Sequence, residues 1–186
     1  MSCENLFLIL NKSVEKIESG KEIFVMNKTA IYPGSFDPIT KGHLDVLKRA
    51  ADIFDKVIIV VSVNLNKKGF IPLEDKLNLI RESCKDIPNV EVDSFDGLTI
   101  EYAKKKNANV LIRGLRAVSD FEYEMQLSQA NSALCQDIHT VFLITKPKYN
   151  FISSGTVREI ALMKGDISKF VPEPVAKYLE EKYMKG

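Results

Sequence analysis

The chain has 186 residues, of which 45% are hydrophobic and 27% are charged, and its net charge is +1. This length allows one domain with a sizeable core and is short for two. A near-neutral balance argues against a general nucleic-acid-binding protein, so any positive site must be local. The longest early apolar run, residues 6–10, is too short to span a bilayer and follows no basic region. We therefore expect no signal peptide, no membrane partner and a cytoplasmic location.

The cysteines and histidines limit the metal and redox chemistry. Cys3, Cys84 and Cys135 are far apart, and no CxxC spacing accompanies them. They are expected to be reduced thiols in a cytosolic protein. With only two histidines in the sequence, a His-rich metal site is excluded.

The first 26 residues differ from the rest. Apolar residues between 6 and 17 can share one helical face, and Gly20 would end that helix. We interpret residues 1–26 as an appended helical extension without predicted chemistry, and residues 27–186 as the functional domain in which the motifs described below occur.

From residue 27 the pattern alternates between short apolar runs and amphipathic segments. The apolar, β-branched run at 57–63 is typical of a strand buried on both faces, as in a parallel sheet. The predicted strands cover residues 29–32, 57–63, 90–95, 110–112 and 140–144. The predicted helices cover residues 42–54, 73–84, 98–106, 119–134, 155–163 and 175–184. This order predicts an α/β fold, a Rossmann-like, doubly wound, five-stranded parallel sheet with C-terminal helices.

In such sheets, ligands bind beyond the carboxyl ends of the strands. The loops that follow the five strands, residues 33–43, 64–69, 95–99, 113–118 and 146–154, should therefore converge on one site. Their polar residues are the candidates for chemistry.

Residues 30–43 read as a strand, a tight loop and the start of a helix, an arrangement whose backbone N–H groups attract phosphate. His43 stands at the helix start. Its imidazole either forms its hydrogen bonds within the helix terminus or donates to a charged phosphoryl group. Ser35 and Phe36 add a hydroxyl and a backbone N–H at the same turn. Neither GxxxxGK[ST] nor GxGxxG is present, so the sequence does not support P-loop or dinucleotide sites.

Cations follow two of the other strands. Lys67 lies in a polar loop where it is either solvated or turned towards the crevice. Arg113 and Arg116 flank Gly114 directly after a buried strand, where a surface arginine is not the default. Because the planar guanidinium suits phosphate recognition, position alone favours a phosphate-binding role for both.

Ser153, Ser154 and Arg158 gather at the last of these loops. A helix cap accounts for one serine but not for the group. The sequence thus offers phosphate binders without an obvious general base or covalent nucleophile. This combination favours phosphoryl or nucleotidyl transfer, in which positioning and charge stabilisation supply most of the catalysis.

Three motifs resemble a known family. Residues 34–43, GSFDPITKGH, are similar to the signature of nucleotidyltransferases with a T/HxGH motif, with Thr40 where many members carry histidine. Residues 112–127, IRGLRAVSDFEYEMQL, and 151–158, FISSGTVR, resemble the signatures of the bacterial-type phosphopantetheine adenylyltransferases. On this basis the stretch from about 27 to 186 is identified as a member of that family, and residues 27–186 as its nucleotidyltransferase domain.

The resemblance implies transfer of the adenylyl group of ATP to 4′-phosphopantetheine, which gives dephospho-CoA and pyrophosphate in coenzyme A biosynthesis. It implies Mg²⁺, held mainly by the ATP phosphates and not by protein ligands. It also implies a homohexamer and no nucleic-acid partner, and it makes coenzyme A a candidate feedback ligand.

The resemblance also assigns site residues. The catalytic residues would be His43, Lys67 and Arg116. The ATP-binding residues would be Ser35, Phe36, His43, Gly114, Leu115, Arg116, Glu124, Tyr149, Asn150, Phe151, Ile152, Ser153, Ser154, Gly155 and Arg158. The residues that bind phosphopantetheine would be Ser35, Lys67, Leu98, Thr99 and Arg113.

The sequence departs from the family pattern after Lys68, where the loop is one residue shorter, and at Gly155, which replaces a hydroxyl residue. Two alternatives stay open. A relative with another acceptor, such as a cytidylyltransferase or a nicotinate-mononucleotide adenylyltransferase, usually has histidine at the position of Thr40 and lacks the 112–127 block. A catalytically silent nucleotide or coenzyme A sensor would have no need to retain His43, Lys67 and Arg116.

Overall fold

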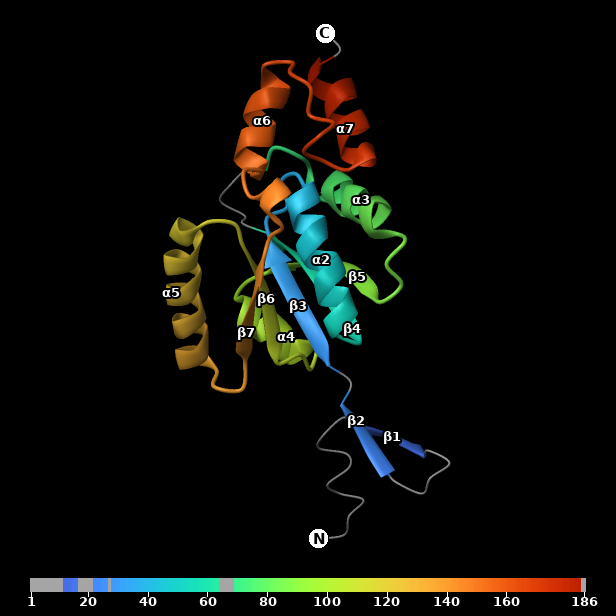
Figure 1. The fold of residues 1–186 in the computed structure, drawn as a ribbon, viewed down its shortest axis with the longest axis vertical. Coiled ribbons are helices and arrows are strands. Elements are labelled where there is room, and N and C mark those ends of the chain that lie inside the picture. Colours follow the sequence, from blue (N-terminus) through green and yellow to red (C-terminus); the bar gives the residue numbers. More distant parts are fainter. Residues whose placement is uncertain (1–11, 17–21, 27, 64–68, 185–186) are drawn as a thin grey trace.

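The computed structural model describes residues 12–16, 22–26, 28–63 and 69–184. Its centre is a parallel sheet in the order β5-β4-β3-β6-β7 (Figure 1). The five strands are β3 (Thr29–Gly34), β4 (Lys56–Val63), β5 (Val90–Asp96), β6 (Val110–Leu115) and β7 (His139–Ile144). Neighbouring strands pair in parallel throughout, so the predicted five-stranded sheet is confirmed.

Helices cover both faces of this sheet. The helices are α2 (Lys41–Ile53), α3 (Leu73–Cys84), α4 (Thr99–Lys105), α5 (Val118–Leu134), α6 (Ser154–Leu162) and α7 (Glu173–Leu179). A short 3-10 turn, η1 (Pro147–Tyr149), follows β7, and a π-type turn, η2 (Glu180–Met184), continues α7.

The core has two layers because strand side chains alternate between the faces of the sheet. On β3, Ala30 and Tyr32 pack into the layer under α2, α3, α6 and α7, whereas Ile31 packs into the layer under α4. Strand β4 divides in the same way, with Ile59 in the first layer and Ile58 in the second. Within the apolar run 57–63, residues 57–61 are therefore buried on both faces, as the composition predicts, whereas Ser62 is exposed.

The described part of the N-terminal segment corrects one prediction. Strands β1 (Lys12–Lys16) and β2 (Glu22–Met26) form an antiparallel pair where a helix was expected over residues 6–17. Residues 1–11 lie outside the described part. The run Glu22-Ile-Phe-Val-Met favours a strand because it is rich in β-branched and aromatic residues.

Candidate active site

A cavity of about 430 Å³ opens at the carboxyl ends of β3 and β6, where ligands bind in sheets of this kind. Its walls come from the turn after β3, the start of α2, β6, α5 and the loop before α6. Ten of the predicted residues line it: Ser35, Phe36, His43, Arg113, Gly114, Arg116, Glu124, Ile152, Ser153 and Ser154. Of the loops that the sequence pattern predicts to converge, those after β3, β6 and β7 therefore meet at this cavity.

The turn after β3 depends on Gly34 and Phe36. A Cβ on Gly34 would lie 2.8 Å from Cζ of Phe36, so only glycine fits beneath this ring. Phe36 has a φ of 43°, a left-handed conformation that bulky residues rarely adopt. This backbone turns the ring inward, where it is buried and meets the His43 ring edge-on, at 5.1 Å between centroids and 81° between planes.

Thr40 fixes both the start of α2 and the orientation of His43. The Thr40 hydroxyl accepts a hydrogen bond from the backbone N–H of His43 at 3.3 Å. In return, the backbone N–H of Thr40 donates to Nδ1 of His43 at 3.1 Å. Because Nδ1 acts as the acceptor, the ring proton of the neutral imidazole resides on Nε2. Nε2 forms no hydrogen bond with a described residue and is available to a ligand.

The environment of His43 keeps its imidazole neutral. Burial, and to a smaller extent the positive charge of Arg116, lower the pKa of His43 to about 4. At neutral pH the side chain is therefore an uncharged Nε2–H donor in the cavity without bound ligand. It is not a general base for a phosphate nucleophile, because its vacant nitrogen already accepts from Thr40.

Arg113 is held by a carboxylate from α5. Its Nε and Nη2 each donate to one carboxylate oxygen of Glu124, at 2.6 Å in both cases. A third donor, Nη1, reaches the carbonyl of Pro33 at 3.2 Å. Glu124 was predicted to contact ATP, and Arg113 to contact the acceptor substrate. The structure shows the two as a bidentate pair, which fixes the plane of the guanidinium.

Arg116, which precedes α5, is held in a similar way by Asp120, which lies one helical turn before Glu124 on α5. Its Nε donates to Asp120 at 3.1 Å, and its Nη1 donates to the carbonyl of Ile152 at 3.2 Å. Asp120 and Tyr123 also line the cavity, and neither was predicted. The i,i+4 spacing of Arg116 and Asp120 was the available signal, although such pairs are common on exposed helices.

The serines before α6 have separate tasks. Ser153 caps the helix by accepting from the backbone N–H of Thr156 at 2.9 Å, as predicted for one serine of the group. Ser154 instead donates to the carbonyl of Pro38 at 2.8 Å, which ties this loop to the turn after β3.

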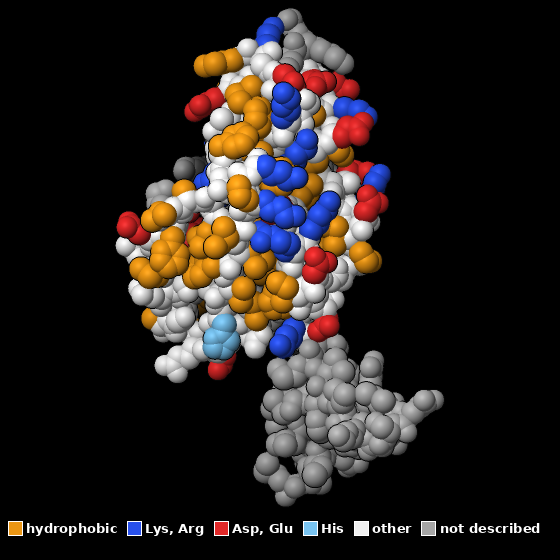
Figure 2. Space-filling view, in the orientation of Figure 1, with side chains coloured by type: hydrophobic (Ala, Val, Ile, Leu, Met, Phe, Trp, Pro, Cys, Tyr) orange, Lys and Arg blue, Asp and Glu red, His pale blue; other side chains and the backbone are white. Residues whose placement is uncertain are grey.

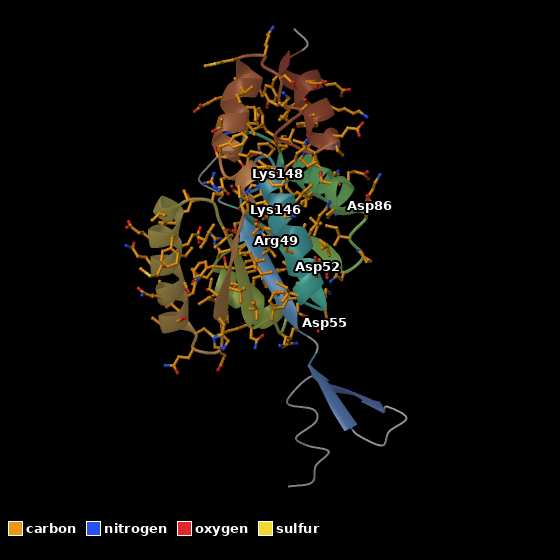
Figure 3. The ribbon with its side chains drawn as sticks, viewed as in Figure 1. Arg49, Asp52, Asp55, Asp86, Lys146 and Lys148 are labelled. Carbon is orange, nitrogen blue, oxygen red and sulfur yellow. The ribbon has the colours of Figure 1, made fainter. Side chains whose placement is uncertain are left out.

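The loop after β7 is also fastened to α2. Buried Asp45 accepts from the backbone N–H of Lys146 at 3.2 Å and pairs with Nζ of Lys146 at 3.4 Å and Nη2 of Arg49 at 3.1 Å. Figure 3 shows Arg49 and Lys146 close together along α2. This anchor holds the loop that supplies Ile152 and Ser153 to the cavity wall.

Asp37 anchors the opposite side of the turn. Its carboxylate accepts from the backbone N–H groups of Phe70 and Ile71, at 2.8 and 3.0 Å, and pairs with Nζ of Lys76 at 3.3 Å. Arg158 donates to the Asp37 carbonyl at 2.6 Å. Arg158, which was predicted to bind ATP, therefore contacts this turn and does not line the first cavity.

A second cavity, of about 1190 Å³, lies beyond Asp37, between the end of β4 and the helices α3, α6 and α7. Gly155 and Arg158 line this cavity, and Ser35 lines both. Buried Lys76 and the C-terminal Tyr178 also line it, and neither belongs to a motif that would single it out in the sequence.

The remaining predicted residues lie elsewhere or outside the described part. Leu115, Tyr149, Asn150 and Phe151 border neither cavity, and Phe151 packs edge-on against Phe170. Leu98 and Thr99 stand at the start of α4, where Leu98 is exposed, and they also border neither cavity. Lys67 lies outside the described residues.

The described residues contain neither a metal cluster nor a membrane-spanning helix. No group of three or more His, Cys, Asp or Glu side chains within them is placed to hold a metal ion. Within the same residues, no helix has the length and apolar character needed to cross a membrane.

Comparisons with known proteins show the family and the fold. Residues 31–160 match the cytidylyltransferase-like family. Over 159 residues the chain is 52% identical to the phosphopantetheine adenylyltransferase of Caldanaerobacter subterraneus subsp. tengcongensis, with 86% of this chain and 99% of that protein covered. A crystal structure from Vibrio parahaemolyticus, assigned as a nicotinate-nucleotide adenylyltransferase, superposes with a TM-score of 0.63. It is 20% identical, covers 83% of this chain and 99% of its own, and so supports the fold alone.

Proposed function

This chain belongs to the phosphopantetheine adenylyltransferases, within the cytidylyltransferase-like family, and from that premise we propose how its cavities perform the transfer. The reaction moves the adenylyl group of ATP to the phosphate of 4′-phosphopantetheine and gives dephospho-CoA and pyrophosphate. The observation that carries the proposal is the convergence of a neutral His43 donor with Arg113 and Arg116 in one cavity at the ligand edge of the sheet.

The chemistry requires no general base. The acceptor phosphate, whose second pKa is about 6, is already largely anionic at neutral pH. One of its oxygens forms a bond to the α-phosphorus of ATP while the bond from that phosphorus to the bridging oxygen of the pyrophosphate breaks, and pyrophosphate leaves. The protein must bring two polyanions together and stabilise the charge that develops between them.

We assign ATP to the first cavity. Its phosphates lie at the start of α2, where Nε2–H of His43 donates to an oxygen on the α-phosphorus and Arg116 adds positive charge. Ser35 borders both cavities. Its hydroxyl is therefore suited to bind the phosphate of an acceptor that extends from the second cavity into the first. Lys67 keeps its predicted role at the reacting phosphates, and Leu98 and Thr99 keep theirs along the pantetheine arm.

Mg²⁺ remains part of the proposal, to neutralise the triphosphate and the leaving pyrophosphate when it is bound. The donors in the first cavity fit an ion carried by the nucleotide. The one carboxylate of Asp120 and the one of Glu124 are both engaged by arginines. Phosphate oxygens would therefore supply most of the ligands, as the family resemblance of the motifs implies.

The test is pyrophosphate release from purified protein with ATP, Mg²⁺ and 4′-phosphopantetheine as the sole acceptor. We expect release that depends on all three. Parallel reactions with CTP, or with nicotinate mononucleotide as acceptor, address the two related activities. No release with phosphopantetheine from a folded protein would contradict the proposal, and binding of coenzyme A without turnover would support a sensor instead.

We also propose that the protein assembles as a homohexamer in the cytoplasm, with coenzyme A as a feedback ligand. Helix α5 supports the assembly, because none of its described side chains is buried in the single chain. Val118, Phe121, Met125 and Leu134 on α5 are exposed, as is Ile144 at the end of the edge strand β7. Figure 2 shows such side chains gathered over α5 and β7, a patch typical of protein interfaces.

Changing Met125 to Glu tests this surface. A buried charge without a partner is costly at an apolar interface, so we expect the variant to dissociate into smaller species at micromolar concentration. Mass measurement in solution, by light scattering or native mass spectrometry, reports the change. Met163→Glu, at an exposed methionine on the C-cap of α6, serves as the matched control and should keep the wild-type mass. A monomeric wild-type protein would refute the assembly.

A further inference from the structure

The first cavity contains a buried tyrosine whose hydroxyl has no partner among the described residues. Tyr32, on β3, lines this cavity and is only 4% exposed. Its ring packs edge-on against Phe36, but its hydroxyl forms no hydrogen bond with any described residue. Among the described residues, every fully hidden polar side-chain atom has a partner. The Tyr32 hydroxyl therefore opens to the cavity.

The surrounding residues keep space in front of this hydroxyl. A Cβ on Gly114 would lie 3.5 Å from the Tyr32 oxygen and 3.2 Å from Cγ2 of Val46. Phenylalanine would fill the same volume in the core without the cost of an unsatisfied polar group. A tyrosine here, next to a glycine in the wall of the cavity, is thus better explained by a ligand than by packing.

The chemistry of this hydroxyl is that of a donor. Burial raises the pKa of Tyr32 above its ordinary value, and the nearby charges of Arg113 and Glu124 act in opposite directions. The phenol is therefore protonated at any pH at which the protein works. It can donate one hydrogen bond to an oxygen or nitrogen atom that carries a lone pair.

The depth of Tyr32 indicates which part of a nucleotide it meets. The start of α2 and Gly34 form the outer layer, where phosphates bind. Tyr32 lies two residues before Gly34 on β3, roughly 7 Å further into the sheet. Val46 lies three residues after His43 on α2, roughly 4.5 Å from the helix start. The three residues of the inner layer, Tyr32, Val46 and Gly114, are uncharged, and the nearby charges of Arg113 and Glu124 are paired with each other, so this layer suits the uncharged end of the ligand.

We propose that the Tyr32 hydroxyl donates a hydrogen bond to the nucleoside part of the bound nucleotide, at an acceptor atom of the base or the ribose. The inference rests on the proposed function, in which that nucleotide is ATP. Tyr32 then contributes to nucleotide affinity and selectivity, and it is distinct from the residues that bind the phosphates.

Tyr32→Phe removes the hydroxyl and little else. By calorimetry we expect ATP to bind about tenfold more weakly, the usual effect of losing one buried hydrogen bond to a ligand. Inorganic tripolyphosphate should bind as it does to the wild-type protein, because it lacks the nucleoside. The melting temperature should not fall, since no protein hydrogen bond is lost.

Tyr102→Phe is the matched control. Tyr102 is also buried, but its hydroxyl donates to Asp93 at 2.6 Å, in the core layer under α4. This variant should bind ATP normally and melt at a lower temperature. The two tyrosines are therefore expected to give opposite patterns of affinity and stability.

Three results would overturn the inference: unchanged ATP affinity in Tyr32→Phe, an equal loss of tripolyphosphate binding, or a lower melting temperature. Pyrophosphate release by the wild-type protein is measured alongside, so an active enzyme with unchanged ATP affinity in the variant would refute the role of Tyr32 and leave the proposed function intact. Repeating the titrations with 2′-deoxy-ATP and 3′-deoxy-ATP separates ribose from base. A ribose contact would lose its dependence on Tyr32 with one of these analogues, and a base contact would keep it with both.

Discussion

Changing His43 to Ala is expected to lower kcat by about a hundredfold to a thousandfold, the effect of removing one preorganised donor at a developing charge. The structure gives the reason. Nδ1 accepts from the backbone N–H of Thr40, so Nε2 carries the proton and is the atom that faces a ligand. ATP should still bind measurably, because Arg116 and the start of α2 are unchanged. Single-turnover rates and ATP titrations of the same variant check both statements.

The second histidine provides the control. His139 is exposed at the start of β7, at the edge of the sheet opposite to the ligand edge. His139→Ala should therefore retain wild-type turnover. Thermal unfolding of His43→Ala should occur at a lower temperature than that of the wild-type protein, since the buried backbone N–H of Thr40 loses its acceptor Nδ1, and turnover is therefore compared at a temperature at which both proteins are folded. Unimpaired turnover in His43→Ala would remove the residue from the mechanism.

The sheet and its helices were predictable because local patterns determine them. The alternating runs located all five strands of the parallel sheet, and α3 has both of its predicted ends. The N-terminal segment was not predictable in this way. Five apolar residues in 6–17 fit a helical face, but the pairing of β1 with β2 decides the conformation of Lys12–Lys16, and pairing is not visible in a single segment.

The site was predictable at the level of loops and less so at the level of contacts. His43 and the two arginines were found because phosphate-binding types occur after strands. The role of Asp37 could not be predicted, because its partners, Phe70 and Ile71, are more than thirty residues away in the sequence. Tyr32 reads in the sequence as an ordinary apolar position of a strand, and only the structure shows that its hydroxyl faces a cavity.

Helix α5 illustrates the same limit and links the site to the proposed assembly. Its sequence has little amphipathic character, so periodicity does not reveal which side faces the sheet. In the structure, one side carries Asp120 and Glu124, which hold Arg116 and Arg113. The rest of the helix exposes the patch that includes Phe121 and Met125. The placement of both arginines therefore depends on a helix that the single chain does not bury.

Changing Glu124 to Gln is expected to lower kcat/KM for phosphopantetheine by about tenfold to a hundredfold, the usual range for a hydrogen bond to a charged group. Arg113 donates through Nε and Nη2 to the two carboxylate oxygens at 2.6 Å each. An amide offers one oxygen and one NH₂ group, so one contact is lost and the guanidinium plane is no longer fixed. Glu122→Gln, an exposed neighbour on the same helix, makes the same change in charge and should have little effect.

A double-mutant cycle decides between two roles for Glu124. If Glu124 acts by holding Arg113, then Arg113→Lys already removes the bidentate contact, and adding Glu124→Gln should cost little more. If Glu124 instead contacts ATP directly, as the family resemblance implies, the two changes should be additive, and Glu124→Gln alone should raise the KM for ATP more than that for phosphopantetheine. We expect the non-additive result, because in the structure both carboxylate oxygens of Glu124 already accept from Arg113. A ligand that needed Glu124 would have to compete with two short, charge-assisted hydrogen bonds.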